Sequence, residues 1–238
     1  MTVQLEVCID SFASALAAQT GGADRLEVCG ALASGGTTPS YGLVEQCVEK
    51  LGLPVMMMIR PHDGGFVYQS SDIDTMLKDI RVAKSIGARG VVFGVLTSQR
   101  QLDQVSCQRL MDATDSLETT FHRAFDLVPN PLDVLNDLER LGFDRVLTSG
   151  QQTTALAGYQ LIQKLTEQTD SVEILAGAGI TSKNALELVG KTGVREIHAS
   201  ASILAEDRQA HGNVSFGAGR KVTCSNQVRA IKDAVTKC

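Results

Sequence analysis

The segment from Val55 to Leu96 decides the fold. It opens with a β-rich run, Val55–Pro61 (VMMMIRP), and closes with a second one, Gly90–Leu96 (GVVFGVL). Between the two runs, apolar residues recur at the spacing of one helical face: Ile73, Met76, Leu77, Ile80 and Ala83. A helix with short connections between two strands predicts that the strands are parallel and joined by a right-handed crossover.

The same alternation extends over the rest of the chain. Six further β-rich runs lie at Gln4–Asp10, Arg25–Gly30, Thr119–Phe125, Arg145–Gly150, Glu173–Ile180 and Glu196–Ser202. Eight such units without a break in composition predict one closed (β/α)₈ barrel, a TIM barrel, as a single domain over residues 1–238. An open doubly wound sheet is the alternative, but the GxGxxG fingerprint of that fold is missing after the first strand.

Local signals place several helix ends and two long loops. Asn130 followed by Pro131 predicts a helix over Pro131–Leu141 that ends at Gly142. We expect Asp72 to cap the third helix and Ser225 to cap the last one, Asn226–Lys237. The long connections are Ala31–Ser40 and Ile203–Cys224, the second of which contains His211 as a loop residue. Both follow strand carboxyl ends, where barrels carry their functional sites.

Composition limits the classes of binding partner and the cellular compartment that we expect for this protein. The net charge of −5, the 4% aromatic residues and the absence of Trp argue against a nucleic-acid partner. No stretch has the ~18–20 apolar residues of a membrane span, and the first ten residues do not resemble a signal peptide. Six scattered cysteines without a CxxC pair are typical of a reducing compartment, so we expect a cytoplasmic protein.

Alternation along the strands predicts an unusually polar barrel interior. If Leu5, Val7 and Ile9 face the helices, their neighbours face the axis. Extended to the other strands, this rule turns seven polar side chains inward: Glu6, Cys8, Glu27, Cys29, Arg60, His122 and His198. We expect Arg60 to be the only inward cation of fixed charge, paired with Glu6, with Glu27 or with a bound anion. The set then forms either a ligand site or a structural ion-pair network.

Two kinds of chemistry are open to these residues. The small residues of Ala176–Gly179 and Ala199–Ser202 lie where many barrels bind phosphate, although they also suit tight packing. In an enzyme for a small anionic or phosphorylated metabolite, the anion would be held by Arg60, Gly177, Gly179 and Ser200. The candidate catalytic acids and bases would be Glu27, His122 and His198.

The second kind of chemistry is metal binding. Cys8 and Cys29 occupy equivalent positions in neighbouring strands, so their sulfurs are expected within a few ångströms of each other. Two thiolates near Met58 and a histidine would suit Cu(I). The alternative is that both cysteines are small buried apolar residues. No motif for an organic cofactor is evident.

Seven motifs in order resemble the CutC family, the copper homeostasis proteins, over residues 4–202. They are LEVCIDS (5–11), GGADRLEVCG (21–30), GGTTPS (35–40), IRPHDGGFVY (59–68), TFHRAFD (120–126), RVLTSG (145–150) and LAGAGI (175–180). The resemblance implies a cytoplasmic TIM barrel, a homo-oligomer (dimer or tetramer), and Cu(I) binding through Cys8 and Cys29. It implies no established catalytic activity, so whether the chain is an enzyme stays open.

The chain departs from the family pattern in two places. The family's GGLTPS is here GGTTPS. The segment Arg60–Phe66 lacks the second arginine of the family's RPRGGDF, which weakens any role that needs two arginines for an anion.

Overall fold

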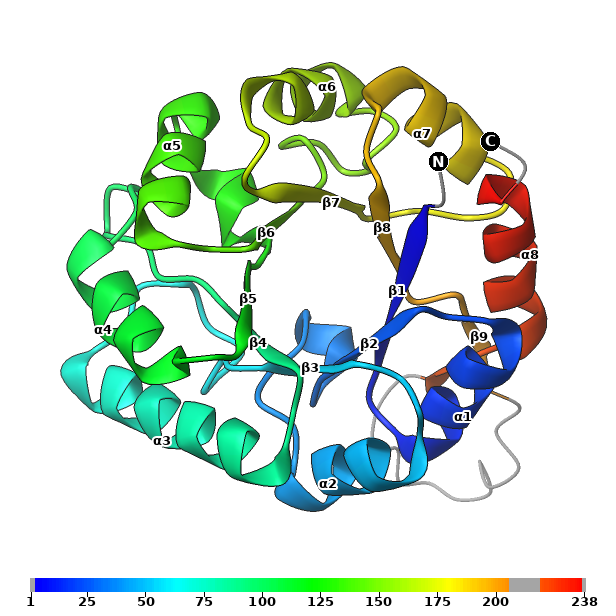
Figure 1. The fold of residues 1–238 in the computed structure, drawn as a ribbon, viewed down its shortest axis with the longest axis horizontal. Coiled ribbons are helices and arrows are strands. Elements are labelled where there is room, and N and C mark those ends of the chain that lie inside the picture. Colours follow the sequence, from blue (N-terminus) through cyan, green and yellow to red (C-terminus); the bar gives the residue numbers. More distant parts are fainter. Residues whose placement is uncertain (1–2, 206–218, 237–238) are drawn as a thin grey trace.

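The computed structural model describes residues 3–205 and 219–236. Eight parallel strands pair in chain order, and β8 closes onto β1, so the predicted barrel is confirmed (Figure 1). The strands are β1 (Gln4–Ile9), β2 (Arg25–Val28), β3 (Val55–Met58), β4 (Gly90–Phe93), β5 (Glu118–Phe121), β6 (Arg145–Thr148), β7 (Glu173–Gly177) and β8 (Glu196–Ala199). Most are shorter than predicted because their last predicted residues have left the sheet and line the carboxyl-terminal end of the barrel.

The α-helices form the outer ring around the barrel (Figure 1). They are α1 (Phe12–Gly21), α2 (Tyr41–Lys50), α3 (Ser70–Ile86), α4 (Gln104–Thr114), α5 (Pro131–Leu141), α6 (Tyr159–Gln168), α7 (Ala185–Thr192) and α8 (Ser225–Val235). No described helix is both long and apolar enough to span a bilayer.

The predicted helix ends are right for α5 and need correction for two other helices. Helix α5 begins after Asn130 and ends at Gly142, whose φ of 84° is the left-handed conformation that glycine adopts without strain. The N-cap of α3 is Gln69, not Asp72. Asp72 lies one turn into the helix, where its carboxylate accepts the Gln69 N–H at 2.9 Å. Helix α8 includes Ser225, because Cys224 is its N-cap.

Side chains alternate across the barrel wall as predicted. Leu5, Val7 and Ile9 are fully buried in the large cluster between strands and helices. A separate, small apolar cluster inside the barrel consists of Cys29, Met56, Met58 and Val92. This sidedness turns the polar residues of β1, β2 and β8 toward the axis.

Both long loops follow strand carboxyl ends, as expected. The first holds the short 3₁₀ helix η1 (Leu32–Ser34) and crosses the end of β3, where Thr38 N–H donates to the Arg60 carbonyl at 2.8 Å. The second begins with β9 (Ser202–Leu204) and returns through β10 (Lys221–Thr223), which is antiparallel to β9. His211 lies outside the described residues.

Candidate site at the carboxyl end of the barrel

A chain of ion pairs fills the amino-terminal half of the barrel interior. Arg25 donates through Nε to Glu6 and through Nη2 to Glu196, both at 2.5 Å. Glu196 also pairs with Arg145 at 3.1 Å, and Arg145 reaches Glu118 at 2.6 Å. The expectation that Arg60 is the only inward cation is therefore wrong. Arg25 is the partner of Glu6 because the two residues are directly opposed in the β1–β2 register.

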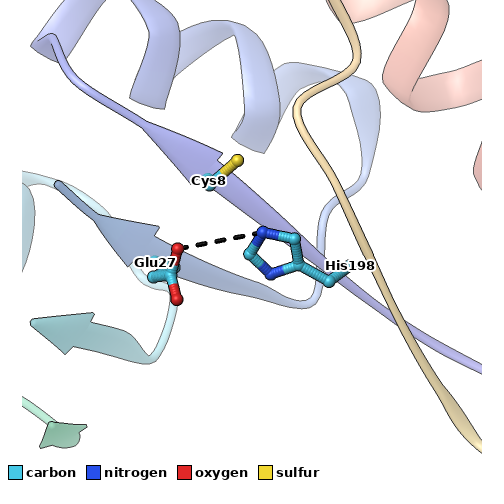
Figure 2. A group of neighbouring side chains, drawn as sticks. All are labelled: Cys8, Glu27 and His198. Carbon is cyan, nitrogen blue, oxygen red and sulfur yellow. Dashed lines mark ion pairs between the residues drawn. The ribbon is translucent and has the colours of Figure 1, made fainter. Parts of the chain in front are cut away.

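Above this layer, Cys8, Glu27 and His198 form the group best suited to hold a metal ion among the described residues (Figure 2). One ligand atom from each lies within 4.8 Å of the other two. His198 Nδ1 lies 2.8 Å from Glu6 Oε1, and its Nε2 lies 3.8 Å from Glu27 Oε2. Adjacent strand positions create the group, since Cys8 is paired with Glu27 and Glu6 with His198.

The electrostatics of this group follow from burial and from its neighbours. Burial disfavours the charged form of Glu6, but Arg25 and His198 outweigh it and lower the Glu6 pKa to about 2. Burial raises the pKa of Glu27. For His198, burial acts against the protonated ring, yet the charges of Cys8 and Glu27 prevail and raise its pKa well above 6.5. The acidic neighbours of His198 therefore favour the protonated form of its imidazole.

Cys29 lies beside this group, but Cys29 and Cys8 are at different levels along the barrel axis. Cys8 is opposite Glu27, whereas Cys29 comes two residues after Glu27, just beyond the end of β2, because neighbouring strands of a barrel are staggered. The prediction that the two cysteines are equivalent in space is wrong for that reason. Cys29 Sγ donates to Glu27 Oε2 at 3.3 Å. Burial, followed by the charge of Glu27, raises the pKa of the Cys29 thiol well above 9.0.

Arg60 and His122 lie apart from this group, at the ends of β3 and β5. Arg60 donates to the carbonyls of Ser34, Gly36 and Gly64. His122 Nδ1 accepts the Ala124 N–H at 3.3 Å. Burial, reinforced by the charge of Arg60, lowers the pKa of His122 to about 3. A histidine that stays neutral in this way is a weak base at neutral pH and is better suited to donate a hydrogen bond.

The predicted anion residues are divided between two places. A cavity of about 360 Å³ opens beside Cys8 and His198, and its lining includes Gly179, Ser200 and Arg123. Arg60 is not among the lining residues, because β3 and β7 lie on opposite sides of the barrel. Gly177 provides room beneath the cavity, since a Cβ there would come 2.6 Å from Leu147 Cδ1 and 3.3 Å from His198 Cβ.

Comparison with known proteins places this barrel in a family. The model of the CutC family matches residues 3–203. This chain belongs to the CutC family. A Histophilus somni protein named as a CutC family protein is 44% identical over 97% of this chain and 98% of its own length. The human "Copper homeostasis protein cutC homolog" is 42% identical over 98% of this chain and 85% of its own length.

A solved structure agrees with this membership of the CutC family, and a second one shares the fold. The crystal structure of a copper homeostasis protein CutC from Streptococcus agalactiae superposes with a TM-score of 0.80 at 32% identity, over 84% of this chain and 99% of that one. A thiamine phosphate pyrophosphorylase from Pyrococcus furiosus has a TM-score of 0.64 at 15% identity, over 99% of this chain and 96% of that one. The second likeness concerns the fold alone.

Proposed function

We propose that this CutC family member binds Cu(I) at the carboxyl end of its barrel, through Cys8 Sγ and His198 Nε2, with Cys29 as a further sulfur ligand. The observation that carries the proposal is the grouping of Cys8, His198 and Glu27 within 4.8 Å. Relatives that are named copper homeostasis proteins support copper as the cargo.

The donor chemistry fits a soft monovalent copper ion. A thiolate and an imidazole suit Cu(I), which also accepts low coordination numbers, whereas a carboxylate is a hard ligand. Glu27 is better suited to take part in proton transfer, because it accepts the Cys29 thiol hydrogen. Cys8 is 8% exposed, so copper can reach it from the cavity that it lines. Binding requires loss of the thiol protons and of one His198 proton.

An anaerobic Cu(I) titration against a competing chelator tests this proposal. We expect the affinity to fall about a hundredfold or more in Cys8→Ser and in the Cys8→Ser, Cys29→Ser double variant, because ligands are lost. Cys47→Ser is the matched control, since Cys47 is a buried thiol of helix α2 far from the site in the fold. Unchanged affinity in the double variant would overturn the proposal.

The cavity beside Cys8 and His198 favours a second candidate, an enzyme for a small anionic or phosphorylated metabolite. Gly179, Ser200 and Arg123 would hold the anion, and His198, which lines the cavity, would transfer protons with the help of Glu27, 3.8 Å away. Inorganic phosphate should then stabilise the protein saturably in a thermal-shift experiment, and Arg123→Ala should remove the effect. Absence of saturable stabilisation by phosphate or by any phosphorylated metabolite counts against this candidate.

Two further properties belong to the proposal. A cytoplasmic location is supported by free thiols at all five cysteines that the structure describes. Assembly into a dimer or tetramer stays a prediction, which light scattering of the purified protein tests directly.

A further inference from the structure

Three largely buried arginines lie around the barrel interior, and they differ in whether a carboxylate neutralises their charge. Arg25 and Arg145 each pair with two carboxylates. Arg60 is only 5% exposed, yet it forms no ion pair with any carboxylate in residues 3–205 or 219–236. A buried charge without a counter-ion is costly. Arg60 therefore carries an unbalanced positive charge at the end of β3.

The bonds of Arg60 hold it in place without neutralising it. Nη1 donates to the carbonyls of Ser34 and Gly36 at 3.0 and 2.7 Å, and Nη2 donates to the carbonyl of Gly64 at 2.7 Å. The third nitrogen, Nε, is buried without a partner among the described residues. The guanidinium is thus fixed by two loops, and its Nε–H has no acceptor among the described residues.

His122 supplies a second free donor beside Arg60. Because its Nδ1 accepts the Ala124 N–H, the proton of the neutral ring resides on Nε2. This Nε2 is also buried and has no partner in the described part of the chain. The Phe66 ring lies against both residues, 5.1 Å from Arg60 Cζ and 4.7 Å from the His122 ring centroid. Phe66 therefore packs against both residues, and Arg60 lies close enough for its charge to act on the His122 ring.

Tyr68 adds a third donor from the same loop. Its hydroxyl is buried without a partner of good hydrogen-bond geometry. Burial raises the pKa of Tyr68 to about 12, although the nearby Arg60 charge acts in the opposite direction. The hydroxyl therefore keeps its proton and can donate. Unpartnered buried polar atoms are rare in native proteins, and three donors beside one uncompensated cation indicate a missing acceptor.

We propose that Arg60, His122 and Tyr68 form a binding site for the carboxylate group of a small ligand. A carboxylate supplies the single negative charge that Arg60 lacks and accepts the Arg60 Nε–H, the His122 Nε2–H and the Tyr68 O–H. The site lies under the loop that follows β3, across the barrel from the Gly179 cavity. The three donors are not copper ligands, and the inference does not depend on the copper proposal.

Isothermal titration of the copper-free protein with sodium acetate, at constant ionic strength maintained with sodium chloride, tests this inference. We expect saturable binding of acetate. Tyr68→Phe and His122→Asn should each weaken it about tenfold, because each removes a hydrogen bond to a charged group. Arg60→Met should abolish acetate binding, but this variant could fail to fold. Tyr68→Phe and His122→Asn avoid that problem, because both keep the three hydrogen bonds from Arg60 to backbone carbonyls. Cys47→Ser, which alters a buried thiol of helix α2, should bind acetate as the unaltered protein does.

Arg123→Met locates the bound acetate. Arg123 lines the opposite cavity, so its loss should leave acetate affinity unchanged. Three results would overturn the site: no saturable acetate binding, affinity that Tyr68→Phe and His122→Asn both leave unaltered, or binding that disappears in Arg123→Met. A crystal structure grown in acetate that shows only water at Arg60 Nε and His122 Nε2 would do the same.

Discussion

Arg25 of β2 joins two carboxylates, Glu6 of the neighbouring strand β1 and Glu196 of β8 on the far side of β1, with 2.5 Å to each. All three side chains are at least nine-tenths buried. Buried ion pairs of this kind add little to the free energy of unfolding when compared with apolar side chains of similar volume. Removal of one partner, however, leaves the other charges buried and uncompensated.

Arg25→Met should therefore destabilise the protein strongly. We expect a loss of about 3–5 kcal/mol in the free energy of unfolding, measured by urea denaturation. Arg195→Met is the matched control, because the Arg195–Glu173 pair lies at the surface, with Arg195 61% exposed. Its loss should cost less than about 1 kcal/mol. Similar losses in the two variants would show that burial of the Arg25 pairs is unimportant.

His122 should impose a pH dependence on stability. Its pKa is lowered from 6.5 to about 3, so between these values the unfolded chain binds a proton that the folded protein does not. The contribution of His122 to the free energy of unfolding is therefore present in full above about pH 6.5. It falls as the pH decreases toward 3, with a limiting slope of about 1.4 kcal/mol per pH unit. Urea denaturation from pH 4.5 to 7 measures the slope.

His122→Asn should flatten this part of the pH profile. His62→Asn, at an exposed position, should leave the slope as it is. A profile that is equally steep in unaltered protein and in His122→Asn would contradict the assignment of the slope to His122.

Gly177 should be sensitive to a single added methyl group. In Gly177→Ala the new Cβ would lie 2.6 Å from Leu147 Cδ1 and 3.3 Å from His198 Cβ. We expect a loss of about 1–3 kcal/mol in thermal or urea unfolding, because the interior must shift to admit it. Gly190→Ala is the control, since nothing lies within 4 Å of its added Cβ in helix α7, and it should stabilise the protein by up to about 1 kcal/mol.

The eight repeated strand–helix units were sufficient to predict the barrel, and the alternation of side chains along its strands predicted the inward direction of Glu6, Cys8, Glu27 and His198. The same rule also turns Arg25 inward, since it shares a parity with Glu27, so that residue could have been found. Alternation shows which side of the sheet a side chain faces, but it does not show the level of that side chain along the barrel axis. For that reason it could not show that Cys8 lies opposite Glu27 rather than Cys29.

The role of His122 was also beyond the sequence. Which ring nitrogen holds the proton depends on the Ala124 N–H, a contact that forms only when η2 (Arg123–Leu127) turns after β5. The position of Arg60 relative to Gly179 likewise depends on the closure of the barrel, which separates β3 from β7.

The ion-pair chain from Glu6 to Glu118 has a consequence for traffic through the molecule. It fills the amino-terminal half of the interior with charged groups that pair with one another. A ligand that enters between the loops above Cys8 must therefore leave along the same path. If Cu(I) binds at Cys8 as we propose, its rates of binding and release should then depend on those loops and not on passage along the barrel axis.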